Sequence, residues 1–180
     1  MKTSMLSLAA LFLLVALCGP SHASNDRINP ADYICAELVT APGLSPEPPL
    51  FPALQLDGWV AAELGEEVAS PEVVMLLVGQ AYQICLTKPA DKVVEHWKEL
   101  RSIAPSPESK WKATKTTCRE FALDSENASG FIIWLDAYNR QVTGSSKSIL
   151  NTDEDVQTFI DACMLSPNRT MLEVLRETAK

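Results

Sequence analysis

Histidine is almost missing from this sequence of 180 residues, which contains only His22 and His96. A zinc site built from several histidines is therefore excluded, and most catalytic triads are excluded with it. The sequence also lacks the glycine-rich loops that bind nucleotide phosphates and the Gly-x-Ser-x-Gly turn of many hydrolases. We therefore expect no enzyme, no metal and no cofactor, and we expect His96 to be an exposed residue of a helix.

Positive charge and long apolar runs are also scarce. Beyond residue 23, 14 lysines and arginines stand against 23 aspartates and glutamates, a net charge of −9 with His96 neutral. Binding to nucleic acid depends on basic residues gathered on one face, so we expect no nucleic-acid partner. No apolar run in this part of the sequence is long enough to cross a bilayer, so we expect no membrane span.

The first 23 residues have the layout of a signal peptide. Lys2 is followed by an apolar run over residues 5–17 and by the small-residue end Ser-His-Ala at residues 21–23. The alternative is a lipoprotein anchored at Cys18, but lipid attachment needs a small residue before the cysteine, and Leu17 is large. We therefore predict that residues 1–23 are removed and that the mature protein works outside the cytoplasm.

The mature sequence contains two similar stretches. Each has a Cys-x-Glu-apolar start, a tryptophan in an apolar segment, a Cys-x-x-x-Pro stretch, and an apolar pair followed by glutamate. In this order, the features lie at residues 35–38, Trp59, 85–89 and 93–95 in the first stretch, and at residues 118–121, Trp134, 163–167 and 171–173 in the second. Four matches in the same order predict a tandem duplication of one small unit.

The boundaries of the two units follow from composition. We place unit one at residues 27–101 and unit two at residues 112–180, joined by the short polar linker 102–111, which contains two prolines. Unit one also contains an insertion at residues 41–52. Its five prolines exclude a regular helix or a central strand there.

Four cysteines remain after the signal peptide, and four cysteines allow three pairings. Only one pairing keeps each repeated unit self-contained, and it joins Cys35 to Cys85 and Cys118 to Cys163. A disulfide that closes a loop of this length stabilises a unit by roughly 4 kcal/mol in the chain-entropy model. Such small units bury little core, so they need this contribution.

Local signals predict an all-α fold. Asn29-Pro30 and Ser70-Pro71 are typical of helix starts, and Thr152 and Thr170 begin sequences of the capping-box type. Apolar residues then recur at helical spacing over residues 71–86 and 152–164. Each unit should have a short helix at its first cysteine, a central apolar helix, a helix ending at the second cysteine, and a final amphipathic helix.

A resemblance to a known family lies in unit two. It rests on residues 116–121 (Thr-Thr-Cys-Arg-Glu-Phe), 130–138 (Gly-Phe-Ile-Ile-Trp-Leu-Asp-Ala-Tyr) and 161–163 (Asp-Ala-Cys). This pattern resembles the HdeA/HdeB family of periplasmic acid-stress chaperones, and unit one resembles a diverged copy. The resemblance implies a periplasmic holdase that opens in strong acid and binds unfolded or acid-denatured proteins. It also implies that the two units pair within one chain as an internal pseudo-dimer.

Two hypotheses for function follow. The first is an acid-activated holdase whose client-binding or inter-unit surface lies on the central helices, at Leu56, Trp59, Val60, Phe131, Ile132, Ile133, Trp134 and Tyr138. An apolar stripe at helical spacing serves equally well as plain core, so this alternative stays open for these residues. The second hypothesis is a constitutive periplasmic binding or inhibitor module of the immunity type, without chaperone activity.

Overall fold

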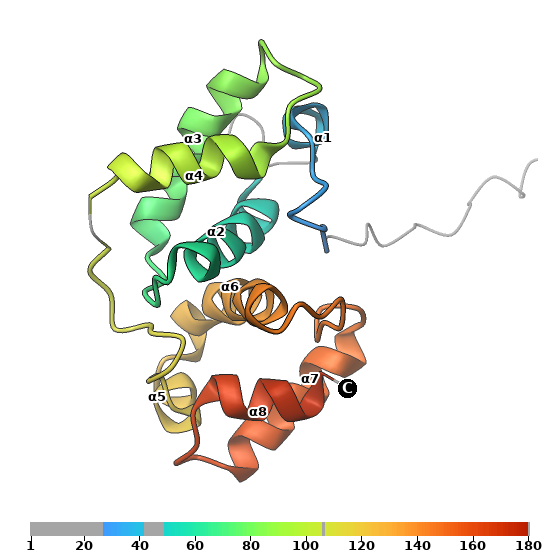
Figure 1. Cartoon of the computed structure of the whole chain (residues 1–180). Helices are drawn as coiled ribbons and strands as arrows, with labels where there is room; N and C mark the ends of the chain where they lie inside the picture. Colours follow the sequence, from blue (N-terminus) through green and yellow to red (C-terminus); the bar gives the residue numbers. More distant parts are fainter. Residues whose placement is uncertain (1–26, 42–48, 106, 180) are drawn as a thin grey trace, which may run out of the picture.

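The computed structural model describes residues 27–41, 49–105 and 107–179, and this part of the chain is helical (Figure 1). The predicted signal peptide and most of the proline-rich insertion lie outside the described residues. Within them there are no strands, only three isolated bridges. The helices are α1 (Cys35–Thr40), α2 (Leu50–Leu64), α3 (Pro71–Cys85), α4 (Val93–Ile103), α5 (Cys118–Leu123), α6 (Ser125–Thr143), α7 (Asp153–Leu165) and α8 (Met171–Thr178). The predicted all-α class is confirmed.

Both predicted disulfides are present. Cys35 is bonded to Cys85, and Cys118 is bonded to Cys163. Each bond joins the start of a short helix to a residue in the last turn of a longer one, α1 to α3 and α5 to α7. The loops that they close therefore include the central helices α2 and α6.

The same backbone contacts recur in the two units. The amide of Cys35 donates to the carbonyl of Asp91 at 2.8 Å, and the amide of Cys118 donates to that of Arg169 at 3.0 Å. The carbonyls of Tyr33 and Thr116 likewise accept from the first residues of α4 and α8, at 3.0 and 2.9 Å. Tandem duplication stays a prediction about this chain, and these matching contacts support it.

Two apolar cores correspond to the two units. Around α1–α4, Leu56, Leu77 and Trp97 are fully buried in one cluster. Around α5–α8, Trp134, Phe159 and other large side chains are fully buried in a second cluster. Burial of this kind is the main force that holds small helical units together.

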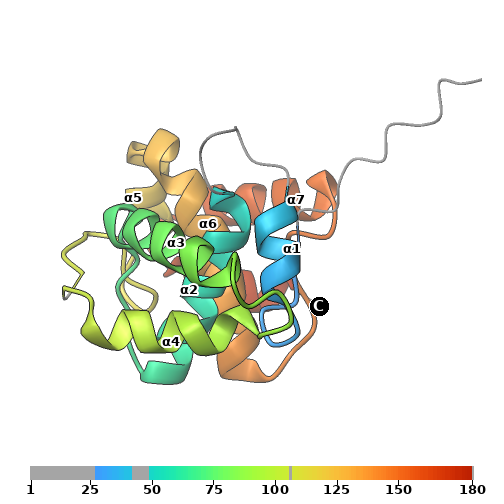
Figure 2. The same ribbon diagram turned by 90° about the horizontal axis from the view of Figure 1, so that it is seen from above.

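The two units are stacked through their central helices. In Figure 1, α1–α4 lie above α5–α8, and α2 and α6 face each other between them. The view from above shows the same order of layers, with α2 and α6 beneath the other helices of unit one (Figure 2). Among the described helices, α2 and α6 have the most extensive contact with each other. This seam between α2 and α6 is therefore the main contact between the units.

The helix starts confirm three of the four predicted caps. The side chains of Ser70, Thr152 and Thr170 each accept a hydrogen bond from the amide three residues later. The prediction at Asn29-Pro30 is wrong, because these residues form a turn, closed by amides that donate to the carbonyl of Asn29. The prediction that the insertion excludes helix is also wrong at its end, since Pro52 lies in the first turn of α2, where a missing amide costs nothing.

The linker is shorter and better anchored than its composition predicts. Helix α4 continues to Ile103. Near the other end, the amide of Ala69 donates to the carbonyl of Trp111 at 3.0 Å, and the amide of Ala113 donates to that of Glu67 at 2.8 Å. Trp111 itself is buried.

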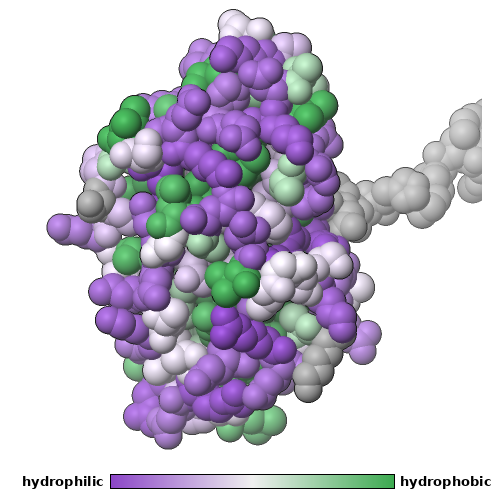
Figure 3. Space-filling model, viewed as in Figure 1, coloured by the Kyte–Doolittle hydropathy of each residue, from purple (hydrophilic) through white to green (hydrophobic). Residues whose placement is uncertain are grey.

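On the face seen in Figure 3, apolar side chains form scattered patches among polar ones.

Candidate functional site: the seam between α2 and α6

A glycine allows the backbones of α2 and α6 to approach closely. A Cβ atom at Gly58 would overlap the carbonyl oxygen of Trp134 and would lie 3.2 Å from the backbone nitrogen of Tyr138. Any other residue here would push the two helices apart. A glycine costs a helix about 1 kcal/mol relative to alanine, so its place in the middle of α2 reflects the needs of the seam.

Apolar side chains cross the seam in both directions. Ala61 of α2 is fully buried in the cluster of unit two, whereas Ile133 of α6 is half-buried against the cluster of unit one. Ala69, just before α3, also belongs to the cluster of unit two. Separating the units would therefore expose part of both cores to water.

A buried carboxylate joins the two units at the centre of the seam. Asp57 of α2 has no exposed surface. Its carboxylate accepts hydrogen bonds from the indole nitrogens of Trp97, at 3.1 Å, and Trp134, at 2.8 Å. It also forms an ion pair with Arg101 of α4. One carboxylate thus holds donors from both units, and each buried donor depends on it.

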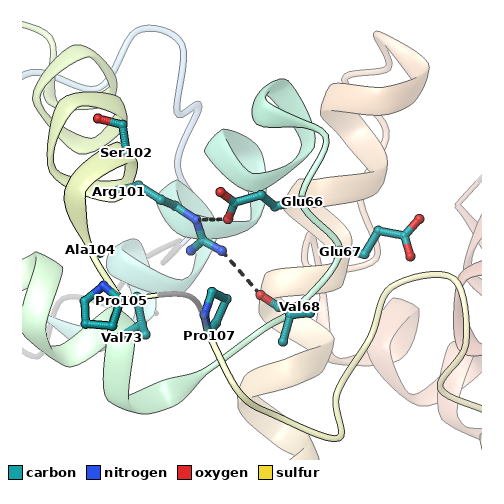
Figure 4. A pocket seen from close by; sticks show the side chains of 9 residues that line it. All are labelled: Glu66, Glu67, Val68, Val73, Arg101, Ser102, Ala104, Pro105 and Pro107. Carbon is teal, nitrogen blue, oxygen red and sulfur yellow. Dashed lines mark hydrogen bonds and ion pairs between the residues drawn. The ribbon is translucent and has the colours of Figure 1, made fainter.

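Arg101 has further partners at the edge of the seam (Figure 4). Its Nε atom donates to Glu66 at 2.8 Å, and one Nη atom donates to the carbonyl of Val68 at 3.3 Å. A hollow opens beside it, between the segment around Glu66 and the linker prolines Pro105 and Pro107. Because Asp57, Glu66 and Val68 already accept from the guanidinium, we assign no ligand to this hollow.

A second buried charge pair lies on α6. Asp136 is fully buried and accepts hydrogen bonds from the hydroxyl of Ser148, at 2.8 Å, and from the amide of Ile149, at 2.9 Å. The Nε atom of Arg140, also buried, is 3.9 Å from the Asp136 carboxylate. Burial raises the pKa of the Asp136 carboxyl, although these hydrogen bonds and Arg140 oppose the shift. Burial likewise lowers the pKa of the Arg140 guanidinium.

The described N-terminal segment lies across the seam. Both Nη atoms of Arg140 donate to the carbonyl of Ile28, at 3.2 and 3.1 Å, and the amide of Ile28 donates to the side chain of Gln55 at 3.0 Å. Arg27 donates to Asn151 at 2.7 Å. Residues 27 and 28 therefore touch α2 on one side and unit two on the other.

An aromatic column runs along α6. The ring centroids of Trp111 and Phe131 are 5.3 Å apart, those of Phe131 and Trp134 are 5.9 Å apart, and those of Trp134 and Tyr138 are 5.2 Å apart. Distances of this size are favourable for aromatic pairs. The column begins at the end of the linker and includes the indole that binds Asp57, so it couples the linker to the seam.

The predicted surface residues fall into three groups. Leu56 and Val60 are fully buried in the cluster of unit one, and Phe131, Ile132 and Tyr138 are buried in that of unit two. Trp134 is buried in the same cluster and reaches Asp57. Ile133 and Trp59 are only half-buried, and the Trp59 ring lies 5.9 Å from the guanidinium carbon of Arg140. Ile133, Trp134 and Trp59 thus contact the opposite unit.

The ends of the two central helices allow another alignment of unit one with unit two. Both central helices end at a glycine with positive φ, Gly65 and Gly144, and the amide after each glycine donates to the carbonyl five residues earlier. Eight residues before these glycines lie Asp57 and Asp136. An alignment on these glycines matches Trp59 with Tyr138, and the expected match of Trp59 with Trp134 stays a prediction.

The ionisable residues of the seam are not among the residues predicted from the sequence. The sequence does contain a signal for the two aspartates. Leu-Asp-Gly-Trp at residues 56–59 and Leu-Asp-Ala-Tyr at residues 135–138 lie at the same distance before the glycine that ends each helix. This match would have identified both aspartates. It gives no indication of their partners, Arg101 and Arg140.

His96 differs from the prediction. It is only 8% exposed, and its Nε2 atom lies 3.0 Å from the carboxylate of Asp91, which precedes it by five residues. Within the described residues no cluster of histidine, cysteine and acidic side chains is arranged to hold a metal ion. No helix in this part of the chain is long and apolar enough to cross a membrane.

Comparison of the chain with protein-family models, with curated proteins and with solved structures finds no match.

Proposed function

We propose that this protein is an exported, acid-activated holdase, which binds unfolding proteins through apolar surface of the seam between α2 and α6. In the proposal, the signal peptide directs the chain to the periplasm, where its two disulfides persist. The main support is the buried Asp57 at the centre of the seam, because the contact between the units depends on a carboxylate.

The chemistry of the seam favours opening in strong acid. Carboxylates lose their charge in acid, whereas guanidinium groups keep theirs. The buried guanidinium of Arg101 is paired only with carboxylates, those of Asp57 and Glu66, and a buried charge left without a partner is strongly destabilising. The net charge of the mature chain also changes from −9 to positive when its 23 acidic residues are protonated, so that the units repel each other.

The units themselves should stay folded while the seam opens. Each keeps its disulfide. Because burial raises the pKa of Asp136, the folded form of unit two binds a proton there more readily than an unfolded chain does. Protonation of Asp136 therefore favours the folded unit in acid, and the opening force must come from the buried charge of Arg101 and from the net charge.

Light scattering by an acid-labile client tests the proposal. The purified mature protein, residues 24–180, should suppress aggregation at pH 2–3 and not at pH 7. Ile133→Ser, in the seam, should weaken this protection, whereas Leu165→Ser, at a site 85% exposed at the end of α7, should not.

Two results would count against the holdase. One is a client that aggregates equally with and without the protein at pH 2–3. The other is a tight complex with one partner at neutral pH and no protection in acid, which would favour the inhibitor hypothesis.

A further inference from the structure

Beyond its first turn, the outward side of α3 has no charged residue. Met75, Leu76 and Leu86, just after the helix, are 43%, 45% and 52% exposed. Their spacing places them on one side of the helix together with Gly79 and Gln83. In the view from above, α3 runs across the near side of the molecule, and none of the other helices drawn lies over it (Figure 2). We call these five residues the α3 face.

The corresponding helix of unit two has acidic residues at three of these five positions. Counting back from the second cysteine of each unit, Met75, Leu76 and Gln83 correspond to Asp153, Glu154 and Asp161 of α7. The three acidic residues are also exposed. Core packing does not explain the difference, because neither set belongs to a core. An exposed apolar group where the other unit has carboxylates is typical of an interaction surface.

Opposite charges lie beyond the two ends of this face. Glu72 precedes Gln80 by eight residues, and Lys88 follows it by eight. When α3 crosses an antiparallel copy of itself near Gln80, Glu72 in the first turn of one helix lies toward the end of the other, and Lys88 of the partner subunit follows that end by three residues. Near the centre, a Cβ atom at Gly79 would meet no other atom within 4 Å, so a second helix can approach closely.

We propose that the α3 face binds the same face of a second copy of this chain, in an antiparallel pair with its two-fold axis near Gln80. The net charge of −9 opposes contact between copies over most of the surface. On the α3 face this repulsion is absent, and the charges beyond its ends are complementary. Each partner in a stable complex buries about 800 Å², which is more surface than the five residues of the α3 face provide. The dimer is therefore reversible and concentration-dependent. This surface is separate from the seam.

Sedimentation equilibrium of the mature protein at pH 7 tests the dimer. Over a hundredfold range of concentration, the mass should rise from one chain toward two. Met75→Asp with Leu76→Glu gives α3 the residues that α7 has, and should weaken association more than tenfold. The matched control is Leu165→Glu, which adds a charge at another exposed apolar site and should leave association unchanged. Far-UV circular dichroism verifies that each variant is folded.

Exchange of the end charges tests the antiparallel arrangement. Glu72→Lys and Lys88→Glu should each weaken the dimer, and the two together should restore it. A single chain at every concentration overturns the proposal, and so does a dimer that the double variant of the α3 face leaves intact. A wild-type monomer that loses client protection on the change of Met75 and Leu76 would show that the face binds clients instead, which also overturns it.

Discussion

The indole nitrogen of Trp134, on α6, donates a 2.8 Å hydrogen bond to the carboxylate of Asp57, on α2. The same carboxylate binds Trp97 and Arg101 of unit one. Asp57 is therefore a shared acceptor, through which the core of unit one is connected to the aromatic column of unit two. Loss of its charge should weaken hydrogen bonds on both sides of the seam.

Asp57→Asn should lower the free energy of unfolding by about 3 kcal/mol at pH 7, because it leaves the buried Arg101 without its main counter-charge. Urea unfolding followed by circular dichroism measures this change. The matched control is Asp32→Asn, which breaks an exposed ion pair to Lys92 with a separation of 3.5 Å. Exposed pairs contribute about 0–1 kcal/mol. Equal effects of the two substitutions would show that Asp57 is not essential to the seam.

Gly58→Ala and Gly79→Ala should have opposite effects, although both glycines lie inside helices. At Gly58 the new methyl group would overlap the carbonyl of Trp134, and overpacking of this kind costs about 1–3 kcal/mol. At Gly79 the methyl group has open space, so that stability should rise by up to about 1 kcal/mol. Thermal unfolding in dilute solution measures both. A stabilised Gly58→Ala protein would mean that the helices lie farther apart.

The pH dependence of stability should separate Asp136 from Glu120. Burial raises the pKa of Asp136, so its contribution is lost as the pH rises through the folded-state value and is present in acid. The backbone and side chain of Thr117 lower the pKa of Glu120, so its contribution is lost as the pH falls. Between pH 7 and about pH 4, near the ordinary carboxyl values, the wild type should gain stability relative to Asp136→Asn and lose it relative to Glu120→Gln. Urea midpoints measured at each pH give both differences, and differences of the same sign would contradict this assignment.

Features set by local sequence could be predicted. Hydroxyl side chains at Ser70, Thr152 and Thr170 satisfy nearby amides, so they fix helix starts wherever the rest of the chain lies. The disulfide pairing followed from the repeat, because closure within each unit needs only the order of the cysteines.

Features set by distant contacts could not be predicted. Asp57 and Arg101 are 44 residues apart, and the sequence does not show that the carboxylate of one meets the guanidinium of the other. Asn29-Pro30 has the composition of a helix start but forms a turn, because the contact of Tyr33 with Val93 holds the following residues extended before α1. His96 was expected on the surface because the local sequence does not distinguish an exposed position on a helix from a buried position beside Asp91.

Acid should open the seam within a single chain. The linker joins the two units, so that α2 and α6 belong to one chain. A short linker keeps each unit at an effective concentration of order millimolar near the other, and opening of the seam is therefore an intramolecular equilibrium. The midpoint of the acid transition should therefore not depend on protein concentration. Tryptophan fluorescence and an apolar dye, followed against pH at concentrations a hundredfold apart, measure it, because Trp97 and Trp134 both donate to Asp57. The variant with Met75→Asp and Leu76→Glu serves as control, since it removes association through α3. A midpoint that moves with concentration in this variant would mean that the seam forms between chains, and no transition above pH 2 would exclude acid activation.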